Sequence, residues 1–205
     1  EIEGKSGPAT SFFDADGEQT GYIQVPGANG VASRQYRSMD VKLDCVNIIK
    51  GTDKDDVLVG TKFVDWIYGY GGDDDIRGGA RADKIFGGAG DDKVWGESGH
   101  DRIYLDSGND WADGGEGDDR INGGRGKDKM FGGVGSDNIK GVDGWGNKIY
   151  GEYGNDILAG GRKDDVVDGG PGDDKITDAA GDNRLYGQAG DDTINGGRNR
   201  DFISG

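Results

Sequence analysis

The chain has 205 residues, and 44 of them are glycine, so about one residue in five has no side chain to pack. The 40 Asp and Glu residues outnumber the 24 Lys and Arg residues, and the resulting net charge of -16 opposes binding to nucleic acid or to an anionic membrane and favours cations. One His, one Cys and two Met are too few for a transition-metal site or a Cys–His nucleophile, and no apolar stretch approaches the ~18 residues of a membrane helix, so we expect no membrane insertion.

The first 41 residues show no repeated pattern. Their apolar residues are scattered and too few for an independent catalytic domain. We expect residues 1–41 to pack as a cap over the structure that the rest of the chain forms.

A nine-residue unit begins at Gly51 and recurs seventeen times up to Ser204, in units such as GGAGDDKVW (87–95) and GGEGDDRIN (114–122). The preceding segment 42–50, KLDCVNIIK, fits the same unit in degenerate form, with Asn47 at position 6 and Ile49 at position 8. A fixed period of this kind indicates a repeat architecture. We expect residues 42–205 to form one repeat domain, in which 42–50 is a capping unit.

Two positions of the unit are held along the whole repeat. Position 6 is Asp in fifteen of the seventeen units and Asn in the other two, at Asn147 and Asn183, and position 8 is apolar in every unit. Because successive side chains of a strand alternate between faces, positions 7 to 9 predict a short strand whose central side chain points inward. Positions 1, 2 and 4 are mostly Gly, as a tight turn with positive φ and closely approaching carbonyl groups requires.

This pattern, G-G-x-G-x-D-x-U-x with U apolar, resembles the calcium-binding nonapeptide of the RTX (repeats-in-toxin) family over about three quarters of the chain. The resemblance implies an all-β fold, a right-handed parallel β-roll (a β-solenoid) with two nonapeptides in each coil. Each nonapeptide would be a six-residue turn followed by a three-residue strand. It also implies Ca²⁺ ions between successive turns, held by Asp carboxylates and backbone carbonyls, which are the hard oxygen donors that calcium prefers.

Two units in each coil place alternate position-6 residues on the same side and split them into two columns. The first column includes Asn147 and Asn183, and it also contains the one ten-residue unit, 141–150, in which Trp145 and Gly146 stand where one residue is expected. We expect a bulged turn there. The second column is uninterrupted from Asp65 to Asp192, and we therefore expect it to bind calcium more strongly.

The candidate metal ligands follow from the columns, and together they predict about 8 to 11 Ca²⁺ ions. The predicted carboxylates are Asp56, Asp65, Asp74, Asp83, Asp92, Asp101, Asp110, Asp119, Asp128, Asp137, Asp156, Asp165, Asp174 and Asp192. The turn glycines of the best-formed units complete the predicted sites: Gly87, Gly88, Gly90, Gly114, Gly115, Gly117, Gly123, Gly124, Gly126, Gly132, Gly133, Gly135, Gly169, Gly170 and Gly172. We predict no catalytic residue and no further cofactor, because no isolated carboxylate pair stands out from these columns.

Positions 7 and 9 point outward and are often basic and aromatic. One sheet is expected to stack Tyr68, Phe86 and Tyr104 beside a row made of Trp66, Lys84 and Arg102. Such side chains commonly shield a sheet whose core is one residue deep. The alternative is a binding face for a polysaccharide, a cell-surface partner, another subunit or an adjoining domain.

The function expected from these features is a secreted or cell-surface module, structural or adhesion-type, that folds on binding several Ca²⁺ ions. Stacked Asp columns one strand spacing apart, ~4.8 Å, repel each other unless cations lie between them. The alternative is the calcium-folding or secretion module of a larger secreted enzyme or toxin. We expect no enzymatic activity from the chain itself.

Overall fold

The computed structural model describes residues 46–142 and 146–205, which belong to one compact unit, Leu43–Gly205. Across these two ranges there are eighteen strands and no helix, and hence no helix that could cross a membrane. The predicted cap, 1–41, and the start of the degenerate unit lie outside the described residues.

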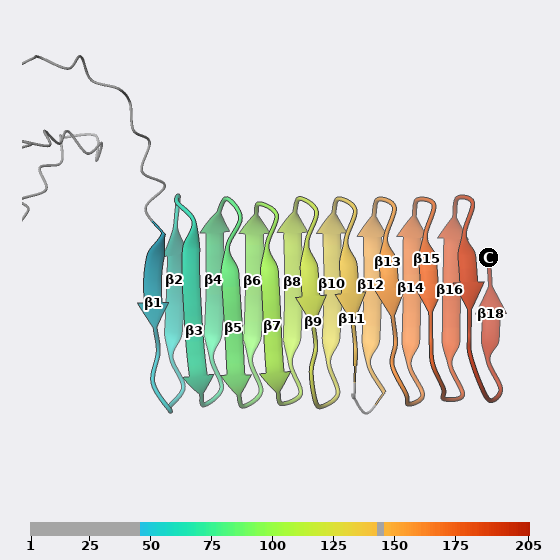
Figure 1. The fold of residues 1–205 in the computed structure, drawn as a ribbon, viewed down its shortest axis with the longest axis horizontal. Coiled ribbons are helices and arrows are strands. Elements are labelled where there is room, and N and C mark those ends of the chain that lie inside the picture. Colours follow the sequence, from blue (N-terminus) through green and yellow to red (C-terminus); the bar gives the residue numbers. More distant parts are fainter. Residues whose placement is uncertain (1–45, 143–145) are drawn as a thin grey trace, which may run out of the picture. The chain divides into compact units, whose positions relative to one another are not determined.

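The strands form two nine-stranded sheets, and consecutive strands alternate between them (Figure 1). The first sheet contains β1 (Asn47–Lys50), β3 (Asp65–Gly71), β5 (Lys84–Ala89), β7 (Arg102–Ser107), β9 (Arg120–Asn122), β11 (Asn138–Lys140), β13 (Ile157–Ala159), β15 (Lys175–Thr177) and β17 (Thr193–Asn195). The second contains β2 (Val57–Thr61), β4 (Asp75–Ala80), β6 (Lys93–Ser98), β8 (Trp111–Glu116), β10 (Lys129–Val134), β12 (Lys148–Tyr153), β14 (Val166–Pro171), β16 (Arg184–Ala189) and β18 (Phe202–Ser204).

Every strand pairs in parallel with the strand two places along the chain, so one coil consists of two nonapeptides. Ile67 lies beside Ile85 and Ile85 beside Ile103, each pair eighteen residues apart. The offset is nineteen only where β10 meets β12 and where β11 meets β13, and there Met130 still lies beside Ile149 and Ile139 beside Leu158. Both columns therefore keep their register past unit 141–150, while the bulged turn predicted at Trp145 lies outside the described residues. The predicted parallel β-solenoid is confirmed.

The core lies between the two sheets and consists mainly of the position-8 column. Its interior members are buried: Leu58, Ile67, Ile76, Ile85, Val94, Ile103, Ala112, Ile121, Met130, Ile139, Ile149, Leu158, Val167, Ile176 and Leu185. Ile194 is partly buried, and Ile203 on β18 is half exposed. The degenerate unit joins the same arrangement, because β1 pairs with β3 and sets Ile49 beside Ile67.

The strands are longer than expected in much of the roll. Three-residue strands occur at β9, β11, β13, β15, β17 and β18, but most of the others have six residues and include positions 1 to 3 of the next unit. The alternation of faces therefore continues past position 8, and Asp74, Ile76 and Gly78 all face inward. Position 1 belongs to the interior of the roll, not to its surface.

This placement corrects the reason expected for glycine at position 1. Positive φ occurs at positions 2 and 4, as at Gly88 (φ 117°) and Gly90 (φ 134°), but not at Gly87 in position 1. A Cβ on Gly87 would lie 2.5 Å from Oδ2 of Asp92 and 3.1 Å from the carbonyl oxygen of Leu105. At Gly87, glycine is therefore favoured by the crowding around position 1 and not by its backbone conformation.

Candidate metal-binding turns

The position-6 residues form two hydrogen-bonded ladders, one in each column. In each ladder, Oδ1 of a position-6 side chain accepts a hydrogen bond from the backbone N–H of the position-6 residue one coil earlier. The N–H of Asp101 donates to Asp119 at 2.7 Å, and the N–H of Asp119 donates to Asp137 at 2.7 Å. The first ladder runs unbroken from Asp56 to Asp201 and the second from Asp65 to Asp192. The register predicted for both columns is therefore present.

The second carboxylate oxygen, Oδ2, has no hydrogen-bond partner in most of these turns. The buried Oδ2 atoms without a partner belong to Asp74, Asp83, Asp92, Asp101, Asp110, Asp119, Asp128, Asp137, Asp156, Asp165, Asp174 and Asp178. A buried charged oxygen without a partner is strongly destabilising, because folding removes its water and gives nothing back. Each of these turns thus presents an oxygen that a cation would stabilise.

Glycines surround each of these oxygens at close range. A Cβ on Gly114 would lie 2.5 Å from the carbonyl oxygen of Gly132 and still closer to Oδ2 of Asp119. The other predicted position-1 glycines, at 87, 123, 132 and 169, lie against the Oδ2 of their own turn in the same way, and the predicted glycines at positions 2 and 4 all have positive φ. A side chain added at these glycines would therefore crowd the Oδ2 atom of its own turn.

Backbone carbonyls must contribute to any such site. Among the described residues, no three His, Cys, Asp or Glu side chains are grouped closely enough to hold a metal ion by themselves. The carboxylate of one turn and the carbonyls of the glycine-rich turns beside it are oxygen donors only, which suits Ca²⁺. The residues present therefore fit calcium, and its binding at these particular atoms stays a prediction.

Burial raises the pKa of the interior position-6 carboxylates from Asp74 to Asp174. The pKa of Asp101 and that of Asp110 rise to about 8, and those of Asp83 and Asp137 rise to about 7. The pKa of Asp119, like that of Asp92, Asp128 and Asp156, rises to about 6. Loss of water on burial is the main cause, the backbone N–H bond opposes it, and neighbouring Asp residues in most of these turns raise the pKa further. The columns lack positive charge, which a divalent cation would supply.

The two Asn turns of the first column differ from the Asp turns. Oδ1 of Asn147 and of Asn183 keeps the ladder, while Nδ2 donates to a carbonyl oxygen, that of Gly160 at 3.3 Å and that of Gly181 at 3.3 Å, respectively. The oxygen and the nitrogen of each amide thus both have hydrogen-bond partners without an ion. A cation would therefore stabilise these turns less than it would stabilise the Asp turns.

Two buried residues were given no role in the sequence analysis: Leu105, which belongs to the hydrophobic core, and Asp178, whose Oδ2 has no hydrogen-bond partner. Both occupy position 1 in the first column, where the other units have glycine, and both are buried. The signal was present in the sequence, since these are the only two of the seventeen units without glycine at position 1. Position 1 was expected to be part of a tight glycine turn, and its exceptions were given no role.

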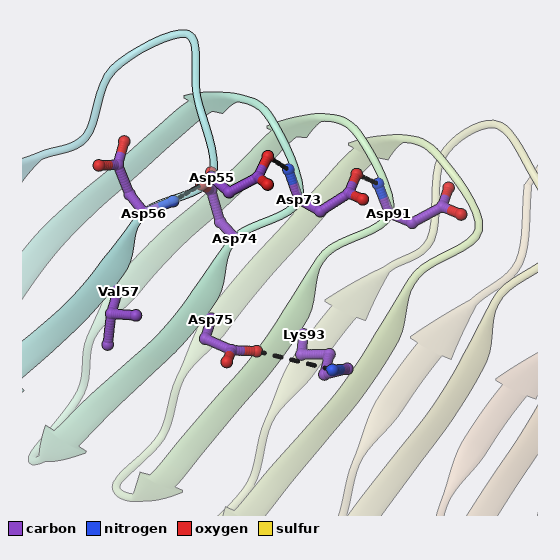
Figure 2. A pocket seen from close by; sticks show the side chains of 8 residues that line it. All are labelled: Asp55, Asp56, Val57, Asp73, Asp74, Asp75, Asp91 and Lys93. Carbon is purple, nitrogen blue, oxygen red and sulfur yellow. Dashed lines mark hydrogen bonds and ion pairs between the residues drawn. The ribbon is translucent and has the colours of Figure 1, made fainter.

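The position-5 residues form further hydrogen-bonded ladders on the outside of the turns. The N–H of Asp73 donates to Oδ1 of Asp55 at 2.9 Å, and the N–H of Asp91 donates to Oδ1 of Asp73 at 2.8 Å (Figure 2). These side chains are exposed and line a hollow on the first turns, next to an ion pair of 3.9 Å between Lys93 and Asp75. In the other column His100 is part of such a ladder, accepting the N–H of Asp118 at Nδ1.

The outer faces of both sheets carry stacked aromatic rings. Tyr68 and Phe86 have ring centroids 4.9 Å apart, and Phe86 and Tyr104 are 5.1 Å apart, with nearly parallel planes. The Lys84 ammonium lies 4.9 Å from the Phe86 centroid and 5.4 Å from that of Trp66. The expected stack is therefore present.

A second aromatic row lies on the other sheet and was not predicted. It is formed by Trp95, Trp111, Phe131 and Tyr150, with centroids 5.0 to 5.7 Å apart, and the Lys129 ammonium lies 4.7 Å from the Phe131 ring. The sequence signal was an aromatic residue at position 9 for Trp95, Phe131 and Tyr150, whereas Trp111 stands at position 7 of its unit.

The fold and these turns define a class of protein: a parallel β-roll whose turns present buried carboxylate oxygens without partners. A comparison with known families gives the same class. The family model described as RTX calcium-binding nonapeptide repeat (4 copies) matches residues 50–80, 77–112, 104–139, 150–177 and 169–203. The matched segments cover more than half of the chain, so the chain belongs to the RTX calcium-binding repeat family. A comparison with curated proteins found no match.

Proposed function

We propose that the chain is an extracellular, structural or adhesion-type module that folds on binding several Ca²⁺ ions. The observation that carries this proposal is the series of buried Oδ2 atoms without partners, repeated in successive turns of both columns. Proteins with RTX repeats bind calcium and are typically secreted, which supports both the ion and the location. Millimolar extracellular calcium would fold the chain after export.

The ions lie between successive turns of each column, and position-6 carboxylates are their charged ligands. Seven intervals of the second column, from Asp65 to Asp192, and four of the first, from Asp56 to Asp128, have Asp on both sides. Departures from glycine in some of these turns reduce the number of strong sites, which gives about 8 to 11 ions. Calcium also relieves the repulsion between stacked carboxylates, so binding and folding are coupled.

The test is far-UV circular dichroism of the full chain during a calcium titration, after removal of metal with a chelator. We expect a disordered or loosely collapsed chain in chelator and a cooperative gain of β signal with calcium. Magnesium is the control, and we expect it to substitute poorly because it requires octahedral geometry and keeps its waters. A full β signal with sharp melting in excess chelator would contradict the proposal.

A repeat-only β-roll is not a known catalytic fold, and we propose that the chain has no catalytic role of its own. The second candidate is the calcium-folding or secretion part of a larger secreted enzyme or toxin. It is favoured by the fact that the family match covers the repeats alone. The reading frame around the gene separates the two candidates, since only the second predicts an adjoining catalytic domain.

A further inference from the structure

Asp178 is a buried acidic residue at a position of the repeat that otherwise contains glycine. It follows β15 directly and begins the turn 178–183, whose position-6 residue is Asn183. Its side chain is 7% exposed, and its Oδ1 accepts the N–H of Ala180 at 3.1 Å. This turn has no carboxylate at position 6, but it has a buried one at position 1.

The carboxylate of Asp178 approaches that of Asp165 one coil earlier. A Cβ on Gly160 would lie 2.9 Å from Oδ2 of Asp165 and closer still to Oδ2 of Asp178. Both Oδ2 atoms are buried, and neither has a hydrogen-bond partner outside this pair of carboxylates. When both are ionised, two negatively charged oxygens thus converge on the space above Gly160, and each repels the other.

We infer that Asp165 and Asp178 together bind one divalent cation of the calcium class in the space above Gly160. The inference rests on the proposed function for the identity of the ion, but it uses a ligand that the repeat pattern does not supply. Two carboxylates provide the charge of a divalent ion, and oxygen-only donors select a hard cation. Asp178 replaces the charge that Asn183 lacks, since Nδ2 of Asn183 is bonded to the carbonyl oxygen of Gly181.

The experiment counts bound ions by native mass spectrometry of the full chain at a fixed free calcium concentration. The variants are Asp178→Gly, which restores the residue usual at position 1, Asp178→Asn, which keeps the size, and Asp165→Asn. The matched control is Asp182→Asn, an exposed residue in the same turn whose Oδ1 accepts the N–H of Arg200. Circular dichroism in calcium establishes that each variant is folded.

We expect both Asp178 variants and Asp165→Asn to carry one ion fewer than the wild type, and Asp182→Asn to carry the same number. A folded Asp178→Gly chain with the wild-type number of ions would overturn this inference alone, because the remaining sites would still be occupied. A wild-type chain that binds no series of calcium ions would instead overturn the proposed function, and this inference with it. The two failures are therefore distinguishable.

Discussion

At the scale of single residues, the two oxygens of each position-6 carboxylate have different roles. Oδ1 joins neighbouring coils through a backbone N–H, as between Asp119 and Asp101, and Oδ2 is left without a partner in the interior. A hydrogen bond to a charged group contributes about 1.5–3 kcal/mol. Removing one such side chain therefore weakens the stacking of coils and removes a charged ligand at the same time.

Asp119→Ala should raise the calcium midpoint of folding by roughly tenfold or more, because Asp119 has an Asp neighbour in its column on both sides, Asp101 and Asp137. Asp165→Ala should raise the midpoint less, because Asn147 and Asn183 flank it in the ladder and Asp165 serves only the one ion that it shares with Asp178. Circular dichroism during a calcium titration measures both midpoints. Equal shifts would contradict this ranking of the two turns.

Gly114→Ala should destabilise the calcium-bound roll by about 1–3 kcal/mol, the usual cost of overpacking. The new Cβ would lie 2.5 Å from the carbonyl oxygen of Gly132 and against Oδ2 of Asp119. Gly71→Ala is the matched control, since its Cβ would have 3.4 Å to the nearest atom. Thermal melts in excess calcium compare the two variants, and equal melting temperatures would refute the crowding of position 1.

At the scale of strands, the aromatic rows cover the outer faces of the sheets. The rings of Tyr68, Phe86 and Tyr104 turn their faces toward each other at about the spacing of the strands that carry them. Ring faces occupied in this way are not free to stack on a sugar ring. The geometry favours the shielding role over a polysaccharide site.

Replacing Tyr68, Phe86 and Tyr104 together by Ser should therefore lower the melting temperature and raise the calcium midpoint. Each stacked pair contributes about 0.5–1.5 kcal/mol beyond the area that it buries. Tyr153→Ser, at an exposed position on β12, is the control and should change little. A triple variant that folds like the wild type and loses binding to a glycan or cell surface would support the binding role instead.

At the scale of the whole molecule, the buried carboxylates link folding to pH. The pKa values of Asp92, Asp83, Asp101 and Asp110 in the metal-free roll, about 6 to 8, lie above the ordinary value of 3.8. The folded chain therefore binds more protons than the unfolded chain between about pH 4 and pH 8. Because these pKa values are raised, the stability of the metal-free roll is present at low pH and is lost as the pH rises through 6 to 8.

In chelator, the chain should show more β signal at about pH 5 than at about pH 8. In calcium the dependence reverses, because protons compete with the ion for the same oxygens, and the calcium midpoint should rise as the pH falls. Circular dichroism at both pH values, with and without calcium, tests both statements. A metal-free chain with the same signal at the two pH values would contradict the raised pKa values.

The sequence by itself determined the repeat-scale features of this protein. The nine-residue period predicted the inward column from Leu58 to Leu185. The resemblance to RTX repeats implied two nonapeptides in each coil, and hence both position-6 columns, and the structure contains all of these features. These features are predictable because each residue mainly contacts its counterpart one coil away. The same contacts recur in every coil, so the sequence of one unit predicts the strand and the turn of the others.

The tertiary structure alone decided what lies between the columns. It decided that position 1 faces the interior, that Oδ1 and Oδ2 have different partners, and that Asp178 reaches Asp165 above Gly160. These contacts depend on how far each strand extends and on which way a side chain turns inside a coil. Neither is fixed by the identity of the residues in one unit, because both follow from the packing of one coil on the next.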